Sequence, residues 1–221
     1  MSQPLVYVSN MHQMKSLLLF IFFCAAQLLT AHPHMSITNR CIVHWDGDSL
    51  SGIQLEWDFD KYFSADIIQG YDLNADGEFD KEELKEIYQF AFSNLEKYHY
   101  FAFFREGEDR FIPEGVEDFT ARYRDRVLTY SFFIPLDDYQ GRDLYIAVYD
   151  YSFFCQVRYD EKAPVALQYD PELLNPEFSI KENRDYPVYY DPYASTSDMT
   201  TYDKWFPGLQ TFIPSEIHIE F

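Results

Sequence analysis

The clearest structural signal in the chain lies in residues 36–59, which read SITNRCIVHWDGDSLSGIQLEWDF. Apolar and polar residues alternate on both sides of a turn at residues 46–48. The apolar positions are Ile37, Cys41, Val43 and Trp45 before the turn and Ile53, Leu55, Trp57 and Phe59 after it. A period of two buries one face of a strand and leaves the other in water. The segment therefore predicts a β-hairpin with one wet face.

The chain as far as about residue 160 continues this β character. Further strands are predicted at residues 98–104, 116–124, 127–134, 144–149 and 153–159, whereas residues 81–97 change to helical spacing. We therefore predict a mainly β (α+β) fold, an antiparallel β-sandwich or open barrel, with an EF-hand-like helix-loop-helix inserted at about residues 60–97. This β domain covers residues 32–170. Residues 171–221 form a Pro- and Tyr-rich C-terminal extension, in which only the last residues alternate like a strand.

The composition limits the classes of function. The 221 residues include 37 acidic and 17 basic side chains, for a net charge of −20, and 19% are aromatic. So many aromatic residues can fill a core, which excludes wholesale disorder. An acidic surface repels phosphate backbones, so we expect no nucleic-acid partner.

The N-terminus carries one long apolar run, KSLLLFIFFCAAQLLTA at residues 15–31. Its apolar part is too short for a bilayer span, which needs about 20 residues. A basic start and a small-residue end at Ala31 predict a signal peptide at residues 1–31, or 14–31 if Met14 is the start. The alternatives are an uncleaved anchor, disfavoured because no stop-transfer flank follows, and lipid attachment at Cys24, disfavoured by the bulky Phe23. We expect a protein exported to the periplasm or secreted, without a membrane span in the mature chain.

The mature chain keeps two cysteines, Cys41 and Cys155. Export to an oxidising compartment makes a disulfide between them one interpretation. Both lie in apolar, strand-like runs, so two buried free thiols are the other.

The twelve residues 72–83, DLNADGEFDKEE, carry the sharpest functional pattern. An EF-hand loop places calcium ligands at positions 1, 3, 5, 7, 9 and 12, with glycine at position 6 for a sharp turn. The residues at the ligand positions are Asp72, Asn74, Asp76, Glu78 through its carbonyl, Asp80 through water, and Glu83. Gly77 occupies the sixth position. We predict a calcium site with a structural role; the alternatives are a regulatory site and an acidic loop that needs no metal.

Cleavage after Ala31 exposes His32-Pro33-His34. An α-amine with two imidazoles can bind nickel, cobalt, zinc or copper ions. The alternative is two exposed histidines on a frayed terminus. His44 and His99 are candidate third ligands, although each alone is better explained as a solvated or packed histidine. Phosphate-binding loops, His-Glu-x-x-His and Gly-x-Ser-x-Gly are all missing from the sequence, so we expect no enzyme.

Several segments together resemble domain-of-unknown-function family 1007. They are residues 31–34 (AHPH), 57–64 (WDFDKYFS), the calcium-type loop, 94–95 (NL) before residues 98–104, and 149–154 (YDYSFF). The resemblance covers roughly residues 31–170, and the tail is longer than the family leads us to expect. It implies an exported component of an uncharacterised transport system that accompanies nickel/cobalt- or zinc-type permeases.

These observations predict a non-enzymatic accessory protein of a divalent transition-metal transport system, in which His32 and His34 capture the metal. Two alternatives remain. One is a calcium-stapled interaction domain that docks a partner protein. The other is a copper oxygenase, which needs a further histidine, His44 or His99, beside His32.

Overall fold

The computed structural model describes residues 34–195, 198 and 200–221. The predicted signal peptide, Cys24 and His32 lie outside these residues. None of the helices in the described part of the chain is long and apolar enough to cross a membrane.

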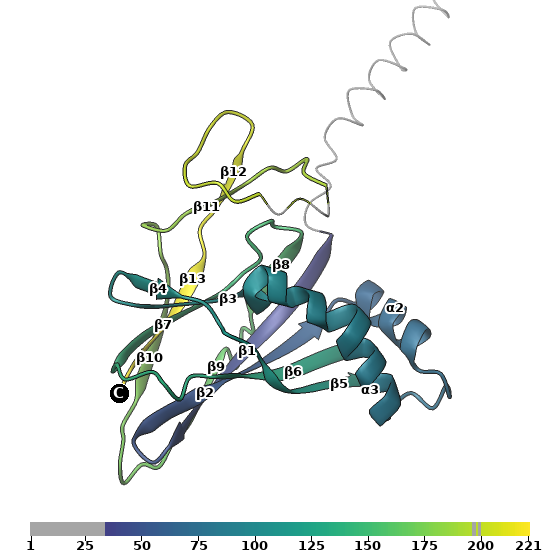
Figure 1. The fold of residues 1–221 in the computed structure, drawn as a ribbon, viewed down its shortest axis with the longest axis horizontal. Helices are drawn as coiled ribbons and strands as arrows, with labels where there is room; N and C mark the ends of the chain where they lie inside the picture. The colour runs from purple at the N-terminus through teal and green to yellow at the C-terminus, as the bar shows by residue number, and fades with distance from the viewer. Residues whose placement is uncertain (1–33, 196–197, 199) are drawn as a thin grey trace, which may run out of the picture. The chain divides into compact units, whose positions relative to one another are not determined.

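The first sheet contains the predicted hairpin at its centre. Its strands run in the order β5-β6-β2-β1-β8, and β9 pairs with β1 as well (Figure 1). The strands are β1 (Met35–Asp46), β2 (Ser49–Phe59), β5 (Glu117–Arg124), β6 (Val127–Pro135), β8 (Cys155–Tyr159) and β9 (Val165–Gln168). Three of the five further strands predicted from the sequence therefore belong to one sheet with the hairpin.

The second sheet has the order β10-β13-β7-β3-β4, and a small third sheet pairs β11 with β12. These strands are β3 (Ala102–Glu106), β4 (Asp109–Phe111), β7 (Asp143–Val148), β10 (Glu177–Glu182), β11 (Val188–Tyr190), β12 (Gln210–Phe212) and β13 (Ser215–Glu220). The predicted terminal strand is confirmed as β13, and it lies between β10 and β7. The Pro- and Tyr-rich extension thus supplies two strands of the second sheet.

The hairpin at residues 36–59 is confirmed in register as well as in extent. Ile37 lies opposite Phe59 and Cys41 opposite Leu55. Cys41 and Leu55 are fully buried, and so are Val43 and Ile53, the next pair on the same face, as alternation requires. The register shifts between His44 and Trp45, and Trp45 is only half-buried.

Both sheets contribute to one hydrophobic core. Trp57 and Phe132 come from the first sheet and Ile146 and Ile217 from the second, and all four are fully buried. Tyr159 of β8 connects the layers: its hydroxyl accepts from the N–H of Val148 at 3.3 Å and lies 3.3 Å from the carbonyl oxygen of Ser215. The arrangement is mainly β with several sheets, and it is not a closed barrel.

The first sheet is mixed, which differs from the antiparallel arrangement predicted from the sequence. β8 and β9 both run parallel to β1, with Met35 opposite Cys155 and Cys41 opposite Val165. Parallel pairing requires a long connection between the paired strands. The connection here comprises all residues between β1 and β8, so no local sequence pattern predicts the parallel pairing.

The helical insertion extends to Phe101 and is less regular than predicted. It contains α2 (Lys61–Tyr71) and α3 (Lys81–Ile87), followed by a π-helical turn, η1 (Tyr88–Phe92), and a kinked 3₁₀ segment, η2 (Ser93–Phe101). The predictions of a regular helix over residues 81–97 and of a strand over residues 98–104 were therefore both wrong in part. Phe92, Tyr100 and Phe101 are all buried, and His99, Tyr100 and Phe101 have positive φ values of 55°, 51° and 56°. Because these rings pack into the core, the regular helix ends even though the sequence keeps helical spacing.

Candidate functional site

The start of β1 carries His34 at a defined position. The backbone N–H of His34 donates to the carbonyl oxygen of Phe154 at 2.9 Å. Its imidazole lies against the Phe154 ring, with 4.9 Å between ring centroids. His34 is nevertheless exposed. A surface imidazole is thus fixed at the strand end from which residue 32 continues.

Asp60 connects the same strand end to α2. One carboxylate oxygen accepts from the N–H of Ser36 at 2.9 Å, and the N–H of Asp60 donates to the Ser36 carbonyl at 3.0 Å. The other oxygen caps α2 by accepting from Tyr62 and Phe63 at 2.9 and 3.1 Å. A residue at the N-cap with a short acceptor side chain is the expected helix start.

Asp150 organises the turn that holds Phe154. It is 3% exposed, and one carboxylate oxygen accepts from the N–H and hydroxyl of Ser152 at 2.8 and 2.7 Å. The other accepts from the N–H of Cys155 at 2.9 Å. This turn holds Phe153 in a left-handed conformation, with φ of 56°. Asp150 thereby positions the backbone carbonyl to which His34 is bound.

Two phenols lie beside this turn. Tyr98 and Tyr151 stack with 5.7 Å between ring centroids. Burial, followed by the nearby Asp150 carboxylate and, for Tyr151, the Tyr98 ring, raises the pKa of both hydroxyls. Both side chains stay neutral around neutral pH, so the negative charge here belongs to the carboxylates. The arrangement favours a cation over an anion.

The loop at residues 72–83 is closed by its last residue. Glu83 is 3% exposed, and its Oε1 accepts from the N–H groups of Leu73 and Asn74 at 2.7 and 3.4 Å. Its Oε2 accepts from the N–H of Asp80 at 2.9 Å, which completes a capping box with the Asp80 side chain. The beginning and end of the loop are therefore joined through one carboxylate.

The remaining ligand positions of the loop bind backbone N–H groups. Asp72 accepts from Asp76 at 3.1 Å and from Gly77 at 2.9 Å, and Asn74 accepts from Asp76 at 2.8 Å. Asp76 accepts from the N–H of Glu78 at 2.9 Å. Gly77 has φ of 84°, the left-handed conformation for which glycine was expected at the sixth position. The loop is tightly turned, with its side-chain oxygens directed inward onto its own backbone.

A third group of polar side chains was missed by the sequence analysis. Asp143, His218 and Glu220 each place one ligand atom within 4.8 Å of the other two, the only such His, Cys, Asp or Glu group in the described part of the chain. By this criterion the carboxylates at 72–83 are not gathered as closely. His218 and Glu220 lie two apart in a predicted strand and so share a face, but nothing local relates them to Asp143.

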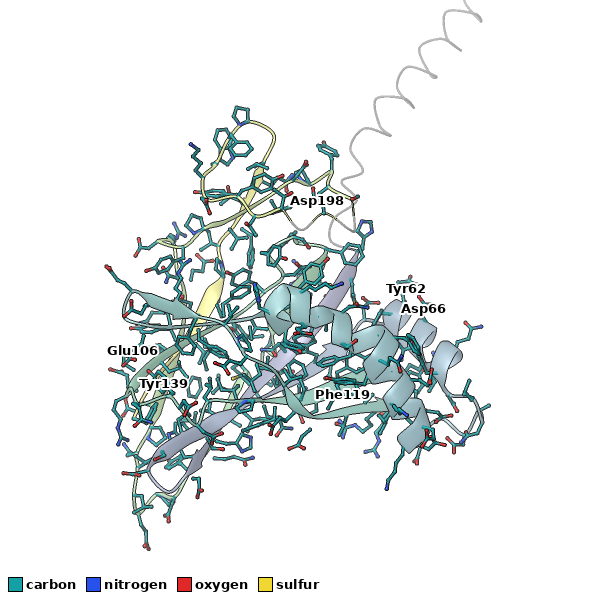
Figure 2. All side chains as sticks on the ribbon, in the orientation of Figure 1. Tyr62, Asp66, Glu106, Phe119, Tyr139 and Asp198 are labelled. Carbon is teal, nitrogen blue, oxygen red and sulfur yellow. The ribbon has the colours of Figure 1, made fainter. Side chains whose placement is uncertain are left out.

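A cavity of about 690 Å³ is lined by none of these residues. The loops that follow β4 and β6 line it, and Tyr139 and Glu106 lie in this part of the molecule (Figure 2). Burial and the Glu106 carboxylate raise the pKa of Tyr139 to about 12. Six of its lining residues are acidic and none is basic: Glu106, Asp109, Glu114, Glu117, Asp137 and Asp138. It contains no side chain that the sequence analysis singled out.

Comparison with known sequences decides the family. The profile of the family described as "Protein of unknown function (DUF1007)" matches residues 17–221. The chain belongs to the DUF1007 family. It is also 32% identical over 104 residues to the "Uncharacterized 15.5 kDa protein in trpE 3'region" of Spirochaeta aurantia, which spans 46% of this chain and 74% of that protein. The family match includes the C-terminal extension, which is consistent with the place of β13 within the second sheet.

In this DUF1007 protein, segments far apart in the sequence meet at the start of β1. Residues 34–36, Asp60, Tyr98 and residues 150–155 are joined by the contacts described above. Most of these residues come from segments on which the family resemblance rests, although Met35, Ser36 and Cys155 do not. The candidate site is therefore the cation-favouring surface around His34.

The two cysteines of the DUF1007 domain are free thiols, and both are buried. Cys155 lies opposite Met35, whereas Cys41 lies six residues further along β1, about 20 Å away at the rise of an extended strand. A disulfide needs Cα atoms within about 7 Å, so the structure favours the free-thiol interpretation. Burial, then the Asp150 and Asp60 carboxylates, raise the pKa of the Cys155 thiol. A protonated thiol is a poor metal ligand.

The candidate third ligands of the DUF1007 terminus, His44 and His99, lie in different elements of the structure. His44 lies nine residues beyond Met35 in β1, about 30 Å along the strand, so it is not a partner for the terminus. It packs against the Phe133 ring, and burial lowers its pKa. His99 follows Tyr98 and lies against the Phe103 ring with 5.8 Å between centroids.

Proposed function

We propose that this protein is an exported, non-enzymatic, metal-binding accessory of a divalent transition-metal transport system. In this proposal His32 and His34 capture the ion, and a membrane permease receives it. The single observation that carries the proposal is the anchoring of His34. Its backbone N–H donates to Phe154 and its ring is exposed, so the proposed chelating arm, His32-Pro33-His34, would be held at a fixed point by its last residue.

The surroundings of His34 support a cationic ligand. Asp60 binds the backbone two residues after His34, and Asp150 binds the backbone next to Phe154. These carboxylates place negative charge close to the arm, while the neighbouring phenols and thiol stay protonated. Imidazole and amine nitrogens suit nickel, cobalt, zinc and copper, and the geometry of the arm selects among them.

We propose further that residues 72–83 form an EF-hand-like loop that binds calcium as a structural ion. The turn at Gly77 and the reach of Glu83 across the loop support this proposal. Calcium would replace the backbone contacts of these carboxylates with ionic ones and link α2 to α3. Because Asp60 caps α2 and also binds Ser36, this brace would be connected to the His34 strand end through α2.

A calcium-stabilised interaction domain is the second candidate function. Exposed aromatic side chains of the C-terminal extension favour it: Tyr193 is 85%, Trp205 54% and Phe206 42% exposed. Contiguous exposed apolar groups are typical of contact surfaces. This candidate predicts no measurable transition-metal site at the terminus.

The test is calorimetric titration of Ni²⁺, Co²⁺, Zn²⁺ and Cu²⁺ into the processed protein, saturated with calcium, after mass spectrometry has established His32 as its first residue. We expect micromolar or tighter binding of at least one ion. The His32→Ala/His34→Ala variant should bind one equivalent fewer of that ion, whereas His44→Gln should keep the full stoichiometry. Absence of binding for all four ions, or equal binding by the double variant, would reject the terminal site.

A further inference from the structure

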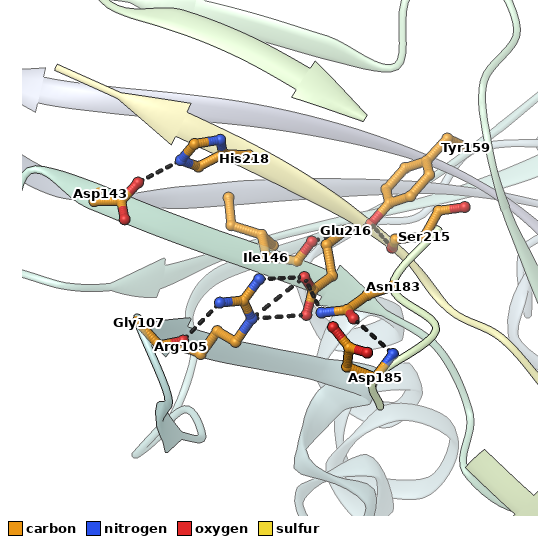
Figure 3. A network of polar contacts seen from close by, with 10 residues as sticks. All are labelled: Arg105, Gly107, Asp143, Ile146, Tyr159, Asn183, Asp185, Ser215, Glu216 and His218. Carbon is orange, nitrogen blue, oxygen red and sulfur yellow. Dashed lines mark hydrogen bonds and ion pairs between the residues drawn. The ribbon is translucent and has the colours of Figure 1, made fainter. Parts of the chain in front are cut away.

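Three side chains with metal-binding chemistry meet on the outer face of the second sheet. Asp143 opens β7, while His218 and Glu220 lie two residues apart in β13 and so share one face. β7 and β13 are antiparallel neighbours, with Glu220 opposite Asp143. Nε2 of His218 is in direct contact with Oδ1 of Asp143 (Figure 3), and a Glu220 oxygen lies within 4.8 Å of both ligand atoms.

The imidazole of His218 is held in this position by a stack across three strands. The Tyr145 ring lies parallel to it, with 4.1 Å between centroids and an angle of 3°. The Arg105 guanidinium of β3 lies over the Tyr145 ring, 3.5 Å from its centroid. Arg105 is itself fixed by Glu216, with its Nη2 2.7 Å from a carboxylate oxygen (Figure 3). A ligand whose orientation is set in advance binds a metal at a lower entropic cost.

Asp143 and Glu220 lie beside His218, and three basic residues, Arg105, Lys181 and Arg184, line the groove that His218 borders. In residues 34–195, 198 and 200–221 no lysine or arginine forms an ion pair with Asp143 or Glu220. Arg142 contacts Asp48 and Arg105 contacts Glu216 instead. Two carboxylates this close repel each other unless a cation lies between them. A divalent ion supplies two positive charges at this position.

The ligand set selects the kind of ion. Calcium and magnesium are bound mainly by oxygens, whereas one imidazole nitrogen with carboxylate oxygens suits divalent first-row transition metals. Bonds of about 2.0–2.2 Å place tetrahedral ligands roughly 3.3 Å apart, so small rotamer adjustments within the present cluster suffice. His218 also borders a surface groove of about 430 Å³, which leaves room for water or another ligand at the fourth position.

We propose that Asp143, His218 and Glu220 bind a divalent first-row transition-metal ion, with Zn²⁺ and Co²⁺ as its probes. The site does not depend on the proposed function of the terminal histidines. Asp143 opens β7 and Asp150 follows the end of that strand, so the two sites are about 20 Å apart along it. The protein thus has a metal site on a rigid sheet as well as a terminal arm.

The test uses the full chain with His32→Ala/His34→Ala, so that the terminal site is removed, in saturating calcium. Co²⁺ is titrated while its visible absorption is recorded, and Zn²⁺ is titrated by calorimetry. We expect one equivalent of each ion to bind, with the intense absorption of tetrahedral Co²⁺. His218→Gln and Asp143→Asn should each weaken binding by at least about tenfold.

A matched control separates loss of a ligand from loss of structure. His44→Gln removes a histidine from the other sheet and should keep the affinity. Zn²⁺ should also protect His218 of the unmodified cluster against diethyl pyrocarbonate, measured by mass spectrometry. Failure of the parent variant to bind either ion, equal binding by His218→Gln, or a lack of protection would overturn the proposal.

Discussion

The N–H of Ser36 donates to the carboxylate of Asp60 at 2.9 Å, which joins the start of the first strand to the start of the first helix. One side chain therefore serves two elements, because its other oxygen caps α2. The strand end that carries His34 and the helix that leads into the loop at residues 72–83 are thereby mechanically connected. A substitution in either element is therefore expected to affect the stability of the other.

Replacing Asp60 tests this connection directly. Asp60→Ala removes an N-cap and the acceptor of the Ser36 N–H, so the free energy of unfolding should fall by about 1–3 kcal/mol. Urea denaturation followed by circular dichroism measures the change. Asp66→Ala, on the exposed side of the same helix (Figure 2), should change it by less than about 0.5 kcal/mol. Equal effects of the two substitutions would show that Asp60 has no special role.

Calcium should stabilise the protein through Glu83. An ion that binds only the folded state raises the melting temperature. The melting temperature should therefore be higher in millimolar calcium than in excess chelator. Glu83→Gln should abolish this calcium-dependent increase, while Glu82→Gln, at the exposed neighbouring position, should retain it. Differential scanning calorimetry with and without calcium makes the comparison. A wild-type melting temperature that is the same with and without calcium would rule out the structural ion.

Cys41 and Cys155 should be unreactive in the folded protein. They are 0% and 4% exposed, and burial raises the pKa of both thiols, so neither presents a thiolate to a reagent. We expect Ellman's reagent to detect neither thiol in the native protein and both after unfolding in guanidinium. A denatured protein without reactive thiols, restored by a reductant, would establish a disulfide instead.

The protein should lose stability at alkaline pH through its buried phenols. Burial raises the pKa of Tyr149 to about 12, whereas a tyrosine in the unfolded chain titrates near 10. The folded state therefore keeps a proton that the unfolded state loses. Its contribution is fully present below about pH 10 and is lost as the pH rises towards 12. Tyr149→Phe should make the urea midpoint fall less between pH 10 and 11, whereas Tyr193→Phe, at an 85% exposed position, should leave the decrease unchanged.

Local patterns predicted the parts of the fold that local contacts determine. The hairpin at residues 36–59 depends on alternation and a tight turn, and both are visible in the sequence. The same holds for β5 and β6, where Asp125 and Arg126 form the turn with φ of 53° and 66°. Alternation of Ile217 and Ile219 likewise revealed β13, because both side chains are fully buried.

Features that depend on distant parts of the chain were not predicted. The parallel partners of β1 are chosen by the packing of the whole sheet, and the helix after residue 87 is broken because Phe92 and Tyr100 enter the core. In the candidate site, His34 and the loop ligands were identified from sequence, whereas Asp150 was named only within the segment 149–154 and Asp143 was not considered. Asp150 is related to His34 through the turn that holds Phe154, and Asp143 meets His218 only in space.

The parallel pairing of β1 also governs the order in which the chain can fold. Met35 pairs with Cys155 and Cys41 with Val165, so one edge of β1 stays open until those residues have been made. The hairpin alone leaves a hydrophobic ribbon with an unpaired edge, which is a template for aggregation. Contacts of such high sequence separation slow folding. In a chain that emerges from its N-terminus, one edge of β1 therefore needs protection until β8 and β9 are available to pair with it.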